Sequence, residues 1–412
     1  MSTTRPIICG VDIGTSKIAT LVGQKKESGN FEISGFGITQ STGVRKGMVT
    51  DIEETISAIS ASLEKAERMA GIPLERAFIS VGGIHISAVN SKGVIAVSRA
   101  DGEISEEDIH RVIEAAKAVS LPANREIIHV VPRAYTVDGQ EGIKDPVGMT
   151  GIRLEVDAHV ISGSTPCIKN LTKCVYQAGL DIDELVFSGL ATSSVFLTKQ
   201  QKEIGVALID IGAATTTMTV FEEGNILHSA VLPVGSDHIT NDIAIGLRTS
   251  IDIAEQIKIK YGRATAAEIN ESEEIDLAKI DKNEKQKVSA VYVAEIIEAR
   301  LQEIFSLIKG ELKDINRDGT LPAGVVLIGG GSKLPEIVDF AKENLKLPSQ
   351  RGKLAIDFSG MIDKIDKDRY ACSLGLLSWG ADTSRRDLAV VKGLEIGKIS
   401  KKIKSLFKHF IP

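Results

Sequence analysis

Residues 7–17 read Ile7-Ile8-Cys9-Gly10-Val11-Asp12-Ile13-Gly14-Thr15-Ser16-Lys17. The apolar run over 7–11 predicts a buried strand, and it ends at an Asp-x-Gly turn. Two further strands, at 18–22 and at about 31–38, are expected after the turn. Apolar residues at helical spacing then predict a helix over 51–70.

The same order of elements recurs later in the chain. A strand at 206–209 runs into Asp210-Ile211-Gly212-Ala213-Ala214-Thr215-Thr216. Strands at 217–221 and 226–234 and a helix at about 238–261 follow. A repeated order at long spacing indicates an internal duplication. Two similar halves that face each other leave a cleft, and clefts between domains favour ligands.

Both Asp-x-Gly turns have the chemistry of phosphate loops. A glycine lets the backbone approach a phosphate closely, and neighbouring N–H groups and hydroxyls can then donate to its oxygens. The carboxylates of Asp12 and Asp210 can hold Mg²⁺ from two sides through its water shell. An ordinary hairpin turn explains either loop taken alone, but two loops in matching strand contexts favour phosphate binding. The residues expected at the phosphates are Gly14, Thr15, Ser16 and Lys17 in the first loop and Gly212, Thr215 and Thr216 in the second.

A third element contains a glycine-rich turn. Residues 325–328 predict a buried strand, and Gly329-Gly330-Gly331-Ser332 follow it. A helix is expected to begin near Pro335, because proline suits the first turn of a helix. Such an element can hold the base and ribose of a nucleotide against bare backbone. A tight strand-to-helix turn without a ligand explains it equally well when it is taken alone.

The C-terminal residues 397–412 differ in character from the rest of the chain. They hold five lysines and no acidic residue, whereas the whole chain has a net charge of −6. At about 100° per residue, the large apolar side chains fall on one side of a helix and the lysines on the other. This separation predicts a helix on an anionic membrane surface, and it fits less well with a helix docked on the protein's own core. The apolar face comprises Ile399, Ile403, Leu406, Phe407, Phe410 and Ile411, and the basic face includes Lys401, Lys402 and Lys408.

Composition argues against several other classes of protein. The negative net charge disfavours non-specific binding to nucleic acid. The chain has no run of 18 apolar residues, so no membrane span is expected, and no secretory signal is expected at the N-terminus. The seven histidines and four cysteines have no metal-ligand spacing. This pattern indicates reduced thiols in a cytoplasmic protein and disfavours a zinc site.

The two Asp-x-Gly loops and the glycine-rich turn, in this order, resemble the actin–Hsp70–sugar kinase superfamily. Within it, essentially the whole chain is similar to the family of the bacterial cell-division protein FtsA. The resemblance implies an α/β fold that is actin-like (ribonuclease H-like and duplicated), with two lobes around a nucleotide cleft, an inserted subdomain and a C-terminal amphipathic helix. The segments that carry the resemblance are 140–148, 208–212, 238–244, 254–258, the small-residue helices at 189–194 and 370–377, and the basic C-terminal helix.

The resemblance also implies a division into domains. The core of the first lobe would comprise 1–83, 161–204 and 360–381, with 84–160 as the inserted subdomain. The core of the second lobe would comprise 205–234 and 305–359, with 235–304 as its subdomain. A linker at 382–396 and the membrane-targeting helix at 397–412 would follow.

The family resemblance further implies the ligands and partners. Glu255 and Lys258, one helical turn apart, would contact the ribose of ATP, and Gly235 would lie at the nucleotide. The segment at about 235–310, with Arg300, would bind the C-terminal peptide of FtsZ. The protein would tether FtsZ filaments to the inner face of the cytoplasmic membrane at the division site. Other divisome proteins and further copies of the chain would be its remaining partners.

The sequence departs from the family pattern at several positions. Ala213 and Ala214 stand where glycines are common, and Ser236 stands where a second glycine is usual. Ser188 replaces the Glu or Gln that orients water in ATP-hydrolysing relatives, and serine is no base near neutral pH. We therefore expect ATP binding with weak or absent hydrolysis, and we assign no catalytic residue. Two other functions of the same superfamily are less well supported. A small-molecule kinase would need an aspartate base in the cleft, and the sequence offers no candidate for it. A chaperone-type ATPase would need a peptide-binding domain after about residue 380.

Overall fold

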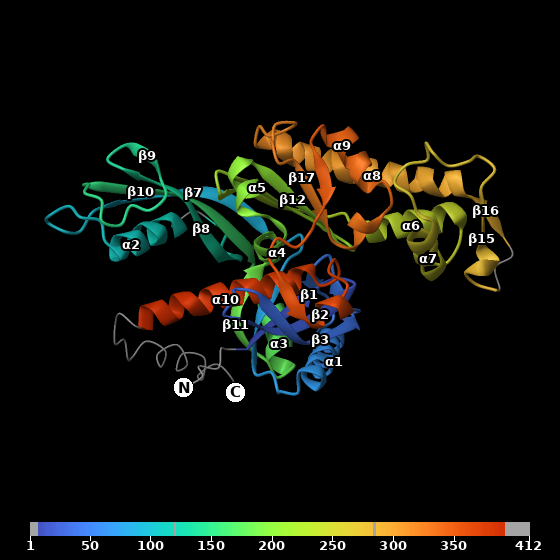
Figure 1. The fold of residues 1–412 in the computed structure, drawn as a ribbon, viewed down its shortest axis with the longest axis horizontal. Coiled ribbons are helices and arrows are strands. Elements are labelled where there is room, and N and C mark those ends of the chain that lie inside the picture. Colours follow the sequence, from blue (N-terminus) through green and yellow to red (C-terminus); the bar gives the residue numbers. More distant parts are fainter. Residues whose placement is uncertain (1–6, 119–120, 283–285, 392–412) are drawn as a thin grey trace.

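The first lobe of the molecule is built on a six-stranded sheet in the order β11-β6-β1-β2-β3-β19 (Figure 1). The computed structural model describes residues 7–118, 121–282 and 286–391. Strand β1 pairs antiparallel with β2 and parallel with β6. Helix α1 (Ile52–Ala70) packs on β2 and β3; Asp51 caps its first turn and Gly71 ends it in the left-handed conformation. The strands are β1 (Ile8–Ile13), β2 (Lys17–Lys25), β3 (Phe31–Gln40), β6 (Arg76–Val81), β11 (Asp181–Phe187) and β19 (Phe358–Gly360).

The second lobe repeats this order as β18-β17-β12-β13-β14. Again the first strand of the repeat, β12, pairs antiparallel with its hairpin partner and parallel with a later strand. The two Asp-x-Gly turns close in the same way: Gly14 N–H donates to Lys17 O, and Gly212 N–H donates to Thr215 O, both at 3.0 Å. The predicted duplication is thus confirmed. The strands are β12 (Val206–Ile211), β13 (Thr216–Glu222), β14 (Asn225–Leu232), β17 (Val325–Ile328) and β18 (Ser349–Arg351).

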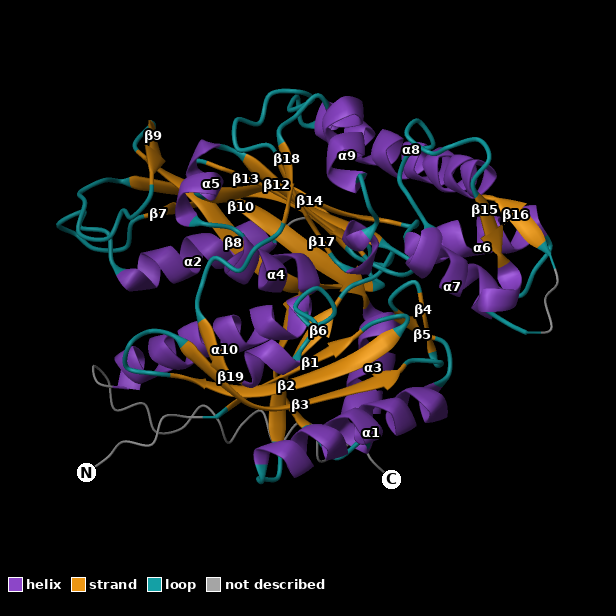
Figure 2. Cartoon of the chain, turned by 45° about the vertical axis from the view of Figure 1, so that its right-hand side comes forward, coloured by secondary structure: helices purple, strands orange, loops and turns teal. Residues whose placement is uncertain are grey.

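Two helices cross between the lobes (Figure 2). The first belongs to the first half of the chain but packs on β13 of the second lobe, where a Cβ at Gly189 would lie 2.7 Å from Thr219 Oγ1. The second belongs to the second half but packs on β1. They touch so closely that a Cβ at Gly375 would lie 2.2 Å from Ala191 O, as their small residues predict. These helices are α4 (Ser188–Phe196) and α10 (Ala371–Val391).

The inserted subdomain is a four-stranded antiparallel sheet, β7-β10-β8-β9, with α2 packed against it (Figure 1). Two of its strands are long: β8 has 13 residues and β10 has 12. Register shifts after Asp157 and Ile161 interrupt the pairing of β10 with β8. Strand β10 ends at Ser164, so the boundary expected at 160 falls inside a strand. The elements are β7 (Ser87–Ala96), α2 (Glu106–Lys117), β8 (Arg125–Val137), β9 (Gln140–Ile143) and β10 (Arg153–Ser164).

The single helix expected at 238–261 is in fact two helices. Arg248 has a φ of 54°, which ends the first helix, and the Ser250 hydroxyl caps the second by accepting from Ile253 N–H. The polar segment at 264–288 contains turns, a 3₁₀ helix over Leu277–Lys279 and two short paired strands. The next helix, α8, runs through the domain boundary expected at 304. These elements are α6 (Ser236–Leu247), α7 (Ile251–Tyr261), β15 (Glu274–Asp276), β16 (Lys287–Ser289) and α8 (Ala290–Asp314).

The remaining elements complete the lobes. Helix α9, expected near Pro335, begins at Ile337 after a 3₁₀ turn over Gly330–Lys333. Helix α10 continues through Val391, so residues 382–391 of the expected linker are helical; the rest of it and the membrane helix at 397–412 lie outside the described residues. No helix in the described part of the chain is long and apolar enough to cross a bilayer. Smaller elements are β4 (Val44–Arg45), β5 (Met48–Val49), α3 (Thr165–Gln177), α5 (Lys199–Ile204) and α9 (Ile337–Leu345).

Candidate nucleotide-binding site

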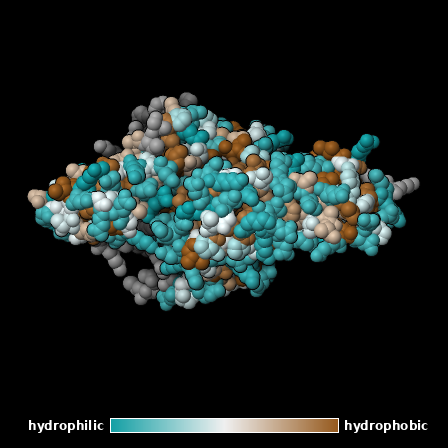
Figure 3. Space-filling view, turned by 90° about the horizontal axis from the view of Figure 1, so that it is seen from above, coloured by the Kyte–Doolittle hydropathy of each residue, from teal (hydrophilic) through white to brown (hydrophobic). Residues whose placement is uncertain are grey.

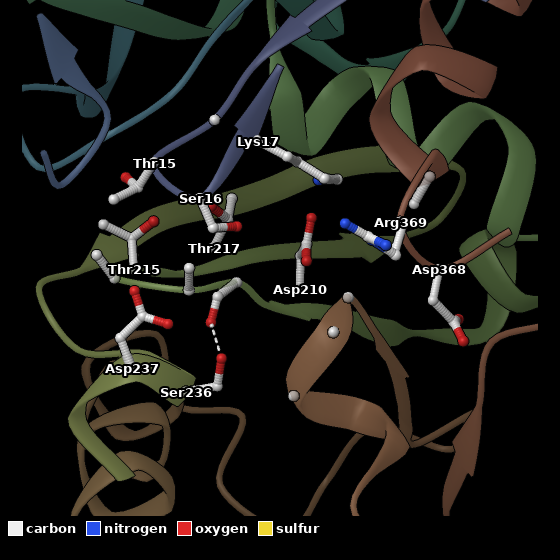
Figure 4. Close-up of a pocket in the computed structure, with 18 of the residues that line it drawn as sticks. Thr15, Ser16, Lys17, Asp210, Thr215, Thr217, Ser236, Asp237, Asp368 and Arg369 are labelled. Carbon is white, nitrogen blue, oxygen red and sulfur yellow. Dashed lines mark hydrogen bonds between the residues drawn. The ribbon is translucent and has the colours of Figure 1, made fainter. Parts of the chain in front are cut away.

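A cavity of about 640 Å³ lies between the lobes (Figure 4). Its walls come from both Asp-x-Gly loops, the glycine-rich turn after β17, helices α6 and α7, and the start of α10. The volume is within the range of pockets that hold drug-sized ligands. The duplicated topology explains the place of the cavity, because the matching turns of the two lobes face each other across it.

The first loop is held by a short chain of hydrogen bonds. Ser80 Oγ accepts from Ile13 N–H at 3.0 Å and donates to Asp12 Oδ1 at 2.9 Å. Lys17 Nζ lies 3.6 Å from Asp12 Oδ2. The Asp12 carboxylate is therefore fixed from the neighbouring strand β6, while the backbone of the loop faces the cavity.

The second loop places Asp210 at the floor of the cavity. Burial raises the pKa of Asp210 to about 6; Asp12 and Asp368 act in the same direction, and Lys17 opposes them. The glycine-rich turn abuts this carboxylate. A Cβ at Gly329, whose φ is +84°, would lie 2.2 Å from Asp210 Oδ1, so only glycine fits there.

A polar cluster on α6 and α7 forms the opposite wall. Lys258 Nζ lies 2.6 Å from Glu255 Oε2 and donates to Thr240 Oγ1 at 2.7 Å and to Ser236 O at 3.1 Å. Because the Lys258 ammonium is buried and paired, its position is fixed before any ligand arrives. Burial raises the pKa of nearby Asp237.

Most of the residues predicted for the nucleotide site line the cavity, but three do not. Thr216 is buried and donates to Val234 O at 2.8 Å, and Ser332 is buried and donates to Gly329 O at 2.8 Å. Gly235 packs under the second loop, where a Cβ would lie 2.5 Å from Ala213 O. These three residues therefore do not line the cavity, in contrast to the prediction that they contact the nucleotide. The predicted residues that do line the cavity are Asp12, Gly14, Thr15, Ser16, Lys17, Asp210, Gly212, Thr215, Glu255, Lys258, Gly329, Gly330 and Gly331.

Several lining residues escaped the sequence analysis. Gly82 and Gly83 follow β6 as the glycine-rich turn follows β17, so the duplication could have revealed them. Thr217 pairs with Asp210 across the hairpin and therefore shares its face of the sheet. Asp237, Asp368 and Arg369 carried no local sequence signal. The alanines that replace the expected glycines cause no strain, because neither Ala213 nor Ala214 has a positive φ.

The donor set fits one magnesium ion better than a metal held by the protein alone. The described residues contain no group of three or more His, Cys, Asp or Glu side chains placed to hold a metal. Mg²⁺ keeps several waters and is commonly bound by one or two carboxylates together with substrate phosphates. The carboxylates of Asp12 and Asp368 help to raise the pKa of Asp210, and a cation at this place would offset that repulsion.

Arg300 lies away from this cavity and is already paired. Its Nε and Nη2 donate to the two carboxylate oxygens of Asp242 at 2.6 and 2.9 Å, and Nη1 donates to Glu303. The side chain therefore joins α8 to α6. The resemblance implied only a partner contact for Arg300, and it gave no sign of this pairing between helices.

Several known proteins are similar to the chain in sequence. A family model described as cell division protein FtsA matches residues 207–375, and one described as the SHS2 domain inserted in FtsA matches residues 83–162. Cell division protein FtsA of Pseudomonas aeruginosa is 38% identical over 91% of this chain and 89% of its own length. The protein of the same name from Bacillus subtilis is 37% identical, with 94% and 85% covered. That from Escherichia coli K12 is 31% identical, with 98% and 97% covered.

Solved structures extend the likeness to the fold. A chain of the PilM–PilN type IV pilus biogenesis complex superimposes with a TM-score of 0.67 at 15% identity, covering 92% of this chain and 99% of that chain. MreB5 of Spiroplasma citri bound to ADP superimposes with a TM-score of 0.55 at 13% identity, covering 94% and 99%. At such identities the match concerns the fold alone, which is the actin-like arrangement of two lobes. The sequence relatives, at 31–38% identity over most of both chains, place this chain in the FtsA family of cell division proteins.

Proposed function

We propose that the protein binds Mg·ATP in the cavity between its lobes and tethers FtsZ filaments to the inner face of the cytoplasmic membrane. The observation that carries the nucleotide part is the pair of matching phosphate loops, each closed by a 3.0 Å hydrogen bond, on two sides of one cavity. Thr15, Ser16 and Thr215 supply hydroxyls for phosphate oxygens. Asp12 and Asp210 would hold the magnesium ion through water, which brings positive charge to the phosphates.

The ribose and base would lie toward the second lobe. Glu255 offers a carboxylate that can accept from ribose hydroxyls, and Lys258 orients it at 2.6 Å. The turn Gly329-Gly330-Gly331 presents bare backbone on the other side. Hydrolysis would be weak, because Ser188 at the first turn of α4 lines the cavity but cannot act as a base near neutral pH.

The subdomain formed by α6, α7 and α8 is the proposed surface for the C-terminal peptide of FtsZ. Large apolar side chains are exposed there: Ile245 is 75% exposed, Ile251 61% and Tyr292 45%. Figure 3 has hydrophobic residues at the end of the molecule where this subdomain lies. Isolated exposed apolar residues are ordinary, but several on one subdomain suit a peptide that brings apolar anchors. Arg300 lies on the same subdomain and would contribute to the field felt by an acidic peptide.

The membrane contact would be made by the basic amphipathic segment at 397–412, which follows the described part of α10. Each lysine near anionic lipid contributes about 1 kcal/mol, and the apolar face adds the burial of large side chains. Further copies of the chain and other divisome proteins are proposed as additional partners, on the strength of the family and of the actin-like fold.

Co-sedimentation with lipid vesicles tests this proposal. Full-length protein should pellet with anionic vesicles and carry FtsZ into the pellet, and protein lacking residues 397–412 should do neither. The truncated protein should still bind FtsZ in solution, which is the control for folding. Vesicle binding by the truncated protein, or full-length protein that pellets without FtsZ, would contradict the tethering function.

A further inference from the structure

Four basic side chains line the cavity, and three of them already have acidic partners. Lys17 Nζ lies 3.6 Å from Asp12, and Lys258 Nζ lies 2.6 Å from Glu255. Lys333 pairs with Asp366. Among the residues that the structure describes, the fourth, Arg369, has no ion pair or side-chain hydrogen bond. The cavity therefore contains one uncompensated cation within reach of its ligand.

The side chain of Arg369 extends into the cavity toward Asp210 from the segment that leads into α10 (Figure 4). Neither Asp210 nor Asp368 lies close enough to form an ion pair with it. Arg369 is exposed, so its guanidinium remains solvated and can turn toward a ligand at little cost. A purely structural arginine at this position would be expected to pair with one of these nearby carboxylates.

The backbone that carries this side chain is well anchored. Tyr370 N–H donates to Asp366 O at 3.0 Å, and the Tyr370 side chain is buried. The Asp366 carboxylate accepts from Lys333. Ala371 and Cys372, the first residues of α10, line the same cavity, so the positive end of the helix dipole adds to the charge of Arg369.

We propose that Arg369 binds the polyphosphate chain of the nucleotide, as a further ligand from the opposite side of Asp210. This inference rests on the proposed nucleotide site. A guanidinium can give two parallel hydrogen bonds to phosphate oxygens, and its charge is maintained at every physiological pH. The paired lysines already have part of their charge offset by carboxylates. Arg369 is thus the cation that responds most directly to the number of phosphates.

The test is calorimetric titration of ATP, ADP and AMP, with Mg²⁺, into the full-length protein and three variants. Arg369→Gln should weaken ATP binding about tenfold, which is the size of one lost charge-assisted hydrogen bond. The loss should be smaller for ADP and near zero for AMP. Arg369→Lys should recover part of the affinity, because it retains charge but loses the bidentate geometry. Lys367→Gln removes an equal charge two residues away, outside the cavity, and should bind all three nucleotides as the wild type does.

The outcomes distinguish a failure of the proposed nucleotide site from a failure of the proposed Arg369 contact. If the wild type binds no adenine nucleotide, the proposed site fails, and the role of Arg369 fails with it. If the wild type binds ATP and Arg369→Gln binds it equally well, only the role of Arg369 is overturned. A loss that is the same for ATP and AMP would also overturn it, since contact with the polyphosphate requires dependence on phosphate number. Thermal unfolding of each variant confirms that the comparison concerns folded protein.

Discussion

The imidazole Nε2 of His159 lies 2.8 Å from the hydroxyl of Ser229. His159 belongs to β10 of the inserted subdomain and Ser229 to β14, the edge strand of the second lobe. From the neighbouring strand β8 of the same subdomain, His129 Nε2 accepts from Phe187 N–H of the first lobe at 3.0 Å. The inserted subdomain is therefore tied to both lobes by buried histidines, immediately beside the helix that begins at Ser188.

Replacement of His159 by Ala should destabilise the protein by about 1–3 kcal/mol, because Ser229 and Asn90 would lose a buried partner. The measurement is denaturant unfolding at pH 7.5. His110→Ala, an exposed change on α2, is the matched control and should leave the free energy of unfolding unchanged. Equal stability of the two variants would show that the contact contributes nothing.

The same histidines should make the fold sensitive to acid. Burial lowers the pKa of His159 to about 3 and that of His129 to about 4, against about 6.5 in the unfolded chain. Between these values the unfolded state binds more protons, so stability falls as the pH drops from about 6.5. His159→Ala should flatten this part of the stability profile. An unchanged slope below pH 6.5 would speak against a neutral, buried imidazole.

The carboxylate of Asp210 should lower the stability of the nucleotide-free protein and strengthen the binding of Mg·ATP. Because its pKa is raised to about 6 in the fold, the carboxylate lowers stability progressively as the pH rises from about 4 through 6. Asp210→Asn should stabilise the nucleotide-free protein at pH 7.5 by on the order of 1–3 kcal/mol. Asp210→Ala and Asp12→Ala should both weaken Mg·ATP binding strongly, since each would remove one of the two carboxylates proposed to hold the magnesium ion through water. Calorimetry with unchanged affinity in both alanine variants would refute the cleft assignment.

Turnover of ATP should be slow. Ser188 stands at the amino end of α4 and lines the cavity, where a longer Glu or Gln could orient water. We expect a rate well below the median of about 10 per second for enzymes. Asp12→Ala protein, prepared in parallel, reveals any contaminating ATPase. A wild-type rate near that median, absent from the Asp12→Ala sample, would overturn the argument from Ser188.

Reversal of charge at Arg300 should reduce binding of the FtsZ C-terminal peptide, but Arg300→Glu alone would also place a third carboxylate beside Asp242 and Glu303. The exchange of Asp242→Arg with Arg300→Asp restores the pair and separates the two effects. Peptide binding by fluorescence anisotropy should fall in the single variant. If the double variant binds the peptide as the wild type does, the ion pair between the two helices is what peptide binding requires. If the double variant binds as poorly as the single variant, Arg300 itself contacts the peptide. Wild-type affinity in the single variant would move the contact elsewhere.

The two faces of the segment 397–412 should act separately. Phe407→Glu with Phe410→Glu places charge where hydrocarbon is expected, and it should abolish vesicle binding at any salt concentration. Gln at Lys401, Lys402 and Lys408 should reduce binding to anionic vesicles only. That deficit should shrink as salt rises, because the Debye length falls from about 10 Å at 0.1 M to about 3 Å at 1 M. If the Gln variant binds neutral vesicles poorly, the lysines contribute more than attraction to anionic lipid, and the separate roles of the two faces are contradicted.

The sequence alone determined the duplicated loops, the lobes that carry them and the ends of α1. These features depend on consecutive residues: a buried strand, a turn with glycine and hydroxyls, and capping residues at a helix end. One such pattern is ambiguous by itself, but its recurrence in the same order of strands and helix is visible in the sequence without any long-range contact. The pattern of 238–261 was insufficient to predict two helices. The break between them is at Arg248, which adopts the left-handed conformation although it is not a glycine.

Only the tertiary structure decided which side chains meet. Thr216 and Thr217 are adjacent, yet hairpin pairing places Thr217 opposite Asp210 and turns Thr216 toward Val234, since successive residues of a strand face opposite sides. Arg300 and Asp242 are separated by 58 residues and their pairing leaves no trace in either local sequence. Arg369 reaches the cavity only because α10 crosses to the first lobe. Long-range packing sets these contacts, and a one-dimensional pattern cannot contain them.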